Sequence, residues 1–187
     1  MTLSENLTLD WSGPHTFWEF VSNSHLRDQF DKRGVYLWIE TSPSRVKQLS
    51  YVGRAISRSL SRRQLEHYAN QIGGLYAIPK EFRESAREWM PNWKNPDPRI
   101  LLDEGEFIKV VSDGFKYAKA VEIYLCPTTS EMDIKAVERK LLFDLRPTRT
   151  KPGTKTEPKR KLFIQHRNPG WLAPEIREHI NNESLFV

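Results

Sequence analysis

GVYLWIETSPSRVKQLSYVG, residues 34–53, contains two strand-like runs separated by a polar turn. Its first part, GVYLWIE at residues 34–40, is rich in the β-branched and aromatic residues that favour strands, and LSYVG at residues 49–53 has the same character. The TSPSRVKQ segment between them has turn chemistry. The stretch predicts a β-hairpin in which Tyr36 and Tyr51 either face each other and share a site or serve as ordinary strand aromatics.

The bulk composition is that of a soluble chain with one domain, residues 1–187. No apolar run approaches the roughly 20 residues of a membrane helix, so we expect no membrane partner. The N-terminus lacks the basic and apolar regions of a secretory leader. Cys126 is the single cysteine, and the histidines are too scattered for zinc spacing. These features predict a reducing, cytoplasmic location.

Positive charge is concentrated in two places along the chain. The formal net charge is +5, but residues 146–167 contain eight Lys or Arg and one acid, a local charge of +7. A second cluster comprises Arg54, Arg58, Arg62 and Arg63. Such clusters indicate a polyanionic partner, nucleic acid first and acidic lipid second, or else a solvated basic tail.

Helix and strand signals alternate along the rest of the chain, which predicts an α+β fold. We expect an irregular arm over residues 1–14, short helices over 15–33, a helix from Ser61 to just before Gly73, and a second helix over 131–145. EFIKVV at 106–111 and YAKAVEIYLC at 117–126, joined at Asp113-Gly114, predict a hairpin. LFIQH at 162–166 predicts a strand, and APEIREHINN at 173–182 a terminal helix.

Glu138 lies on the apolar face of the predicted 131–145 helix. On a wheel of about 100° per residue, Ile134, Val137, Leu141, Leu142 and Leu145 fall within roughly 140°, and Glu138 falls inside the same arc. Burying a charged carboxylate on a core face costs folding free energy unless a positively charged partner lies beside it. Three partners satisfy this requirement: an arginine such as Arg63 or a neighbour, a proton, or a metal ion.

The order of these motifs resembles that of the GIY-YIG nucleases. The family pattern is Gly-Ile/Val-Tyr, a loop, Tyr-Ile/Val-Gly, an Arg, a His or Tyr one helical turn later, a Glu on a later helix, and an Asn beyond it. Here "GVY" begins with Gly34 and ends in Tyr36, "YVG" runs from Tyr51 to Gly53, "RRQLEHY" supplies Arg63 and His67, and "ERKLLFDLRPTRT" supplies Glu138. Thr150 stands where the family usually has Asn.

The resemblance implies a small central, mostly antiparallel sheet flanked by helices, and a site that hydrolyses phosphodiesters. The family-like core would span about 33–150, with an insert at about 70–118 and a basic extension at 151–187. Glu138 would bind one divalent ion, Mg²⁺ or Mn²⁺, and Arg63 would hold a phosphate oxygen. Tyr36 would be the general base, a role that His67 could share or take over, and Tyr51 would orient water or phosphate.

The resemblance also implies a DNA partner and an enzyme of restriction or mobile-element type, in a bacterial or phage context. Glycines 34 and 53 and Thr150 would support the site, and a homodimer would serve double-strand cleavage. The alternative is a catalytically weakened module that binds nucleic acid. The residues expected to contact the nucleic acid are Arg54, Arg58, Arg62, Arg149, Lys151, Lys159, Arg160 and Lys161.

Overall fold

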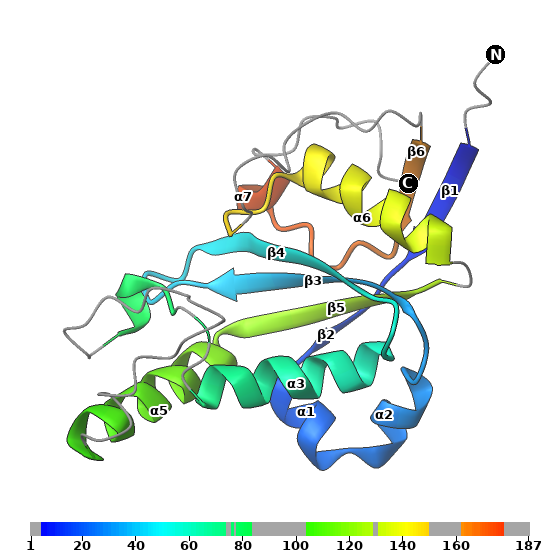
Figure 1. The fold of residues 1–187 in the computed structure, drawn as a ribbon. Coiled ribbons are helices and arrows are strands. Elements are labelled where there is room, and N and C mark those ends of the chain that lie inside the picture. The colour runs from blue at the N-terminus through cyan, green and yellow to red at the C-terminus, as the bar shows by residue number, and fades with distance from the viewer. Residues whose placement is uncertain are drawn as a thin grey trace.

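The computed structural model describes residues 5–73, 76, 78–83, 104–128, 131–149 and 162–177, and within these it is an α+β fold (Figure 1). The strands are β1 (Glu5–Asp10), β2 (Ser12–His15), β3 (Gly34–Thr41), β4 (Lys47–Ala55), β5 (Val121–Pro127) and β6 (Leu162–Arg167). The helices are α1 (Phe17–Ser22), α2 (Ser24–Gln29), α3 (Leu60–Ile72), a 3-10 turn η1 (Lys80–Phe82), α5 (Glu104–Lys119), α6 (Glu131–Leu145) and α7 (Pro174–Arg177).

A four-stranded antiparallel sheet, in the order β2-β5-β3-β4, forms the centre of the fold. β3 is buried along almost its whole length because it is an inner strand with helices on both faces. β4 is an edge strand of this sheet. A separate two-stranded parallel pair joins β1 near the N-terminus to β6 near the C-terminus. The expected hairpin over 34–53 and the expected sheet flanked by helices are therefore confirmed.

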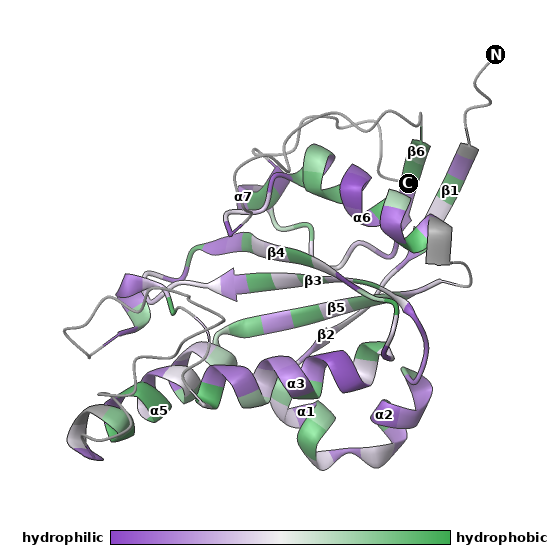
Figure 2. Cartoon of the chain, in the orientation of Figure 1, coloured by the Kyte–Doolittle hydropathy of each residue, from purple (hydrophilic) through white to green (hydrophobic). Residues whose placement is uncertain are grey.

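Each face of the sheet carries its own hydrophobic core. On one face, α6 packs over β3 and β4, and Val35, Leu37 and Val52 join the apolar residues of α6. On the other face, Tyr36, Trp38 and Ile123 pack with residues of α1, α3 and α5. Figure 1 shows α6 on one side of the sheet and α1, α3 and α5 on the other, and Figure 2 shows hydrophobic and hydrophilic residues mixed along these helices. Consecutive residues of β3 and β4 thus point to helices on opposite faces.

Several predicted elements are present with small changes. The helix expected over 131–145 is α6, the strand expected at 162–166 lies within β6, and α7 begins at Pro174 as expected. The helix expected from Ser61 begins one residue earlier: Ser59, not Ser61, is its N-cap and accepts from the backbone N–H of Arg62. Ser61 is buried in the first turn.

Two predictions were wrong. Residues 106–111 are not a strand but part of α5, where Val110, Asp113, Gly114, Tyr117 and Ala118 form a buried helical stripe. Gly114 is not a turn residue, because a Cβ there would lie 2.5 Å from the carbonyl oxygen of Gln71, so it permits close contact between α5 and α3. The expected irregular arm instead contains β1 and β2, whose partners β6 and β5 lie more than 100 residues away in sequence.

A buried acid secures the end of the β3–β4 hairpin. Glu40 is 1% exposed and accepts hydrogen bonds from Gln48 Nε2 at 2.8 Å and Tyr117 Oη at 2.9 Å. The Nε atom of Arg149 lies 3.9 Å from the Glu40 carboxylate, and its guanidinium covers the Tyr117 ring at 4.5 Å. The backbone N–H of Arg149 donates to the carbonyl of Ser50. Arg149, expected to contact nucleic acid, is therefore a partner of this buried cluster.

We predict that Arg149→Met destabilises the protein, because the buried Glu40 carboxylate would lose the cation beside it. The free energy of unfolding should fall by about 2 kcal/mol, less than the roughly 3–5 kcal/mol of a fully buried pair, since Arg149 retains some solvent contact. Urea denaturation measures the change. Adding Glu40→Gln should recover most of the loss, and Arg62→Ala, at an exposed position, should change stability by less than about 0.5 kcal/mol. A stable Arg149→Met protein would contradict this role.

Candidate active site at the edge of the sheet

Tyr36 and Gly53 are paired directly in the β3–β4 register. A Cβ atom on residue 53 would lie 2.3 Å from Cζ and 2.4 Å from Oη of Tyr36, and 2.6 Å from the Tyr51 ring. Tyr51 pairs with Trp38, so Tyr36 and Tyr51 are diagonal neighbours on one face rather than directly opposite, with ring centroids 6.0 Å apart. Gly53 thus provides the space in which both phenol rings lie.

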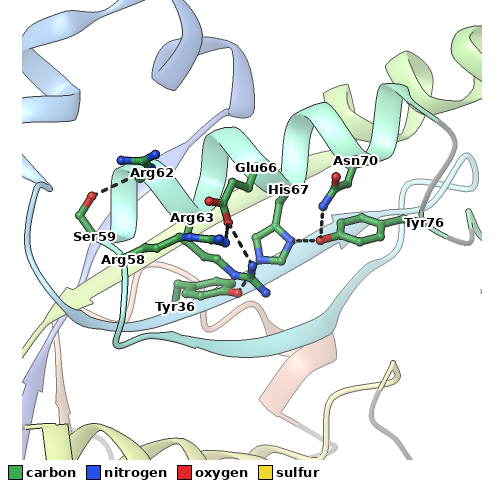
Figure 3. Close-up of polar contacts among 9 residues, drawn as sticks. All are labelled: Tyr36, Arg58, Ser59, Arg62, Arg63, Glu66, His67, Asn70 and Tyr76. Carbon is green, nitrogen blue, oxygen red and sulfur yellow. Dashed lines mark hydrogen bonds and ion pairs between the residues drawn. The ribbon is translucent and has the colours of Figure 1, made fainter. Parts of the chain in front are cut away.

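Helix α3 places two side chains beside the Tyr36 hydroxyl. His67 Nε2 lies 2.6 Å from Tyr36 Oη, and the guanidinium of Arg63, one helical turn before His67, lies next to them, where its charge acts on Tyr36 (Figure 3). Gln64, on the same side of α3, accepts from Trp38 Nε1 at 3.1 Å. The prediction that Arg63 and His67 share one face of this helix is confirmed.

Glu138 approaches from α6, which packs on the opposite face of the sheet. Its side chain is 16% exposed and forms an ion pair with Arg54 of β4. Of the three partners considered for this carboxylate, an arginine is the one present, and it is Arg54 rather than Arg63. Burial raises the pKa of Tyr51, the charge of Arg63 lowers it, and the charge of Glu138 raises it further. The pKa of this residue on the edge strand β4 thus responds to groups of both α3 and α6.

Burial dominates the protonation of the site. It raises the pKa of Tyr36 well above its ordinary value; Tyr51 adds to this rise, whereas the charge of Arg63 lowers the pKa. Burial and then the charge of Arg63 lower the pKa of His67 to about 3. Burial also raises the pKa of Glu138, although Arg54 opposes the rise. In this state Tyr36 is a phenol and His67 a neutral imidazole at pH 7.

The other predicted cationic residues have different surroundings. Arg58 pairs with Glu66, which also accepts from Arg63 at 3.2 Å, and Arg62 is exposed. The first backbone N–H groups of α3, those of Leu60 and Ser61, donate to the carbonyls of Lys32 and Phe30. These N–H groups are therefore engaged within the protein.

The remaining predicted residues are Gly34 and five residues beyond α6. Gly34 is packed against the Cys126 carbonyl. Thr150, Lys151, Lys159, Arg160 and Lys161 lie outside the described residues.

Three members of the cluster have no counterpart in the sequence predictions. Tyr76 Oη lies 2.7 Å from His67 Nδ1 and accepts from Asn70 Nδ2 at 3.1 Å, and Glu66 joins Arg58 to Arg63 (Figure 3). Asn70 and Glu66 lie within one turn of His67 on α3, so helical spacing could have indicated them. Tyr76 follows the helix, and no local sequence signal places its hydroxyl beside the imidazole.

The donors available for a metal ion are few. Within the described ranges, no three or more His, Cys, Asp or Glu side chains gather into a group that could hold an ion. Glu138 would therefore be a single carboxylate ligand, which suits Mg²⁺ where water and phosphate oxygens fill the remaining positions.

Two further findings concern the chain as a whole. None of the helices that the structure describes is long and apolar enough to cross a bilayer. Comparison of the chain with models of protein families, with curated proteins and with solved structures finds no match.

We predict that Gly53→Ala displaces the Tyr36 ring, since the added methyl group would overlap its hydroxyl end. Overpacking of this kind should lower the free energy of unfolding by about 2 kcal/mol, measured by urea denaturation. Gly170→Ala is the control, because a Cβ there meets its nearest neighbour at an ordinary 3.6 Å. Equal stability of the two variants would show that Tyr36 does not occupy this space.

We also predict that His67 makes the fold sensitive to acid. Its folded pKa of about 3 lies below the unfolded value of 6.5, so between these pH values the unfolded chain binds the extra proton. Stability should thus fall as the pH drops from about 6.5 to about 3, by at most about 1.4 kcal/mol per pH unit for this group. His67→Gln should flatten the dependence of urea midpoints on pH, whereas His25→Gln, at an exposed position, should not. An unchanged slope in His67→Gln would refute a neutral, buried His67.

Proposed function

We propose that the protein is a metal-dependent DNA endonuclease that hydrolyses phosphodiester bonds, with a site resembling that of GIY-YIG nucleases. One observation carries the proposal: Tyr36, Tyr51, Arg63 and His67 cluster on one face of the β3–β4 hairpin, and Glu138 of α6 pairs with Arg54, the residue that follows Gly53 on β4. Two phenols, a guanidinium and an imidazole thus lie at one end of the edge strand, with a carboxylate beside that strand on the other face, although they are spread over a hundred residues of sequence. A hydrophobic fold alone does not require this combination.

The side chains suit the demands of phosphodiester hydrolysis. A water oxygen must bond to phosphorus while the bond to the leaving sugar oxygen breaks, one water proton must be removed, and the leaving oxygen must gain one. Tyr36 is the group to accept the water proton once it has become a phenolate. Arg63 favours that phenolate through its charge, and its planar fork can also bind a phosphate oxygen. Tyr51 would orient the water or the phosphate.

Glu138 is the residue that would hold the ion, Mg²⁺ or Mn²⁺. A divalent ion at this carboxylate would neutralise phosphate charge and lower the pKa of bound water. Glu138 pairs with Arg54 in this structure. Arg54 would have to release the carboxylate, and a DNA phosphate offers it a replacement partner.

Exposed cations next to the site provide a path for the DNA backbone. Arg54 and Arg58 have side chains 39% and 51% exposed, and Arg62 is exposed at the first turn of α3. Their pairs with Glu138 and Glu66 leave guanidinium N–H groups for phosphate oxygens. Contacts of this kind position the duplex without reading its sequence. A cytoplasmic location, restriction or mobile-element context and a homodimer for double-strand cleavage remain part of the proposal.

The second candidate is a module that binds nucleic acid without cleaving it. The Arg54–Glu138 ion pair favours it, because a guanidinium then supplies permanently the positive charge that an ion would otherwise supply. The two candidates differ in whether Glu138 is needed for an activity or for stability.

The deciding experiment is nicking of supercoiled plasmid DNA with Mg²⁺ or Mn²⁺, with EDTA in parallel reactions. We expect nicking by the wild-type protein, its loss with EDTA, and a decrease of at least about 100-fold in Glu138→Gln and Tyr36→Phe. Glu122→Gln is the matched control, because Glu122 is also a partly buried carboxylate held by a cation, Lys47. DNA binding without nicking in both metals would support the second candidate. Nicking that persists in Glu138→Gln would remove the role of this carboxylate.

A further inference from the structure

A chain of hydrogen bonds runs through the buried side of the site. Asn70 Nδ2 donates to Tyr76 Oη at 3.1 Å, Tyr76 Oη meets His67 Nδ1 at 2.7 Å, and His67 Nε2 meets Tyr36 Oη at 2.6 Å (Figure 3). His67 is 2% exposed and Tyr76 8% exposed. Both imidazole nitrogens of His67 are therefore occupied by phenol hydroxyls, one on each side.

A neutral imidazole has one N–H donor and one acceptor nitrogen, so the two hydroxyls must play opposite roles. His67 is neutral because burial, with the charge of Arg63, holds its pKa to about 3. If Nε2 carries the proton, His67 donates to Tyr36 and accepts from Tyr76. If Nδ1 carries it, both directions are reversed.

The surroundings of Tyr36 suit the first arrangement. Figure 3 shows the guanidinium of Arg63 beside the Tyr36 hydroxyl, and its charge favours negative charge on that oxygen. An N–H donor from His67 Nε2 acts in the same direction, whereas a proton on Nδ1 would make Tyr36 the donor.

The surroundings of Tyr76 agree with this direction. The side-chain amide of Asn70 donates to Tyr76 Oη. A hydroxyl that accepts one hydrogen bond becomes a better donor in the next. Tyr76 therefore donates to His67 Nδ1, His67 Nε2 donates to Tyr36, and every bond in the chain points from Asn70 towards Tyr36.

We propose that Tyr76, oriented by Asn70, is a positioning residue that fixes His67 as the tautomer with its proton on Nε2. As a consequence His67 serves as a hydrogen-bond donor to Tyr36, not as a proton acceptor. Its role for the reaction rests on the proposed function: the N–H donor of His67 meets the Tyr36 oxygen beside the positive charge of Arg63, and both favour its phenolate over its phenol. His67 then assists Tyr36 as base and does not replace it.

The tautomer can be measured without DNA or metal. Long-range ¹H–¹⁵N correlation spectra of the uniformly ¹⁵N-labelled full chain at pH 7 distinguish a protonated from an unprotonated imidazole nitrogen, and His67→Gln identifies the His67 signals. We expect one tautomer in the wild-type protein, with the proton on Nε2. Tyr76→Phe keeps the ring and removes the hydroxyl, so its spectrum should show loss of this single tautomer.

Two further variants separate the hydroxyl from general effects on the fold. Asn70→Ala keeps Tyr76 and should shift the Nδ1 signal in the same direction as Tyr76→Phe but less far, which preserves the test if Tyr76→Phe does not fold. Tyr68→Phe is the matched control, because Tyr68 lies next to His67 on α3 but packs against Phe17 and Phe115. It should leave the His67 spectrum unchanged. A proton on Nδ1 in the wild-type protein, or an unchanged tautomer in both Tyr76→Phe and Asn70→Ala, overturns the proposal.

An activity measurement then connects the tautomer to the reaction. Tyr76→Phe should lower the single-turnover nicking rate about tenfold while leaving the affinity for DNA within twofold. A protein without any nicking but with the Nε2 tautomer would contradict the endonuclease and leave the role of Tyr76 towards His67 supported. A spectrum of the Nδ1 tautomer together with full nicking would contradict the role of Tyr76 towards His67 and leave the endonuclease supported.

Discussion

The ring of Tyr36 lies over Gly53, in the space that any other residue at that position would fill with its Cβ atom. This contact requires the β3–β4 register, because a shift by one residue would turn Tyr36 to the opposite face. The register also places Tyr51 diagonally beside Tyr36 and directs both rings to α3. The arrangement of the candidate site therefore depends on the Tyr36–Gly53 pair in the sheet, and the helices supply the remaining side chains.

The second requirement is that β4 is an edge strand of the sheet. α3 and α6 lie on opposite faces, and the charges of Arg63 and Glu138 both shift the pKa of Tyr51 on this strand. The segment after α6 donates backbone hydrogen bonds to Leu49 and Ser50, at the beginning of the strand. Burial keeps Tyr36 and His67 neutral, whereas the arginines at the rim stay charged. Repulsion among the rim arginines is small while they are paired with carboxylates. A polyanionic substrate would exchange these ion pairs for pairs with its own phosphate groups.

The sequence predicted the hairpin, α6 and the candidate residues of the site because each has a local signal: strand residues with a turn, helical periodicity, and a carboxylate on an apolar face. Prediction from the sequence failed where the structure of a segment depends on contacts with distant residues. β1 forms through pairing with β6, and Gly114 permits helix contact instead of forming a turn. Arg149 was read from its charge as a nucleic-acid ligand, but the buried Glu40 is its partner. Arg54 as the partner of Glu138, and Tyr76 beside His67, depend on packing that no local pattern encodes.

If a metal ion binds Glu138 next to the two phenols of the hairpin, Mn²⁺ in the presence of a short DNA duplex should broaden the NMR signals of both rings by paramagnetic relaxation. The ring signals of Tyr51 and Tyr36 should broaden at lower Mn²⁺ concentration than those of Tyr124 of β5, which β3 separates from the edge strand β4, and Glu138→Gln should abolish this order. Broadening that spares both phenols, or that persists unchanged in Glu138→Gln, would contradict a metal site at this carboxylate.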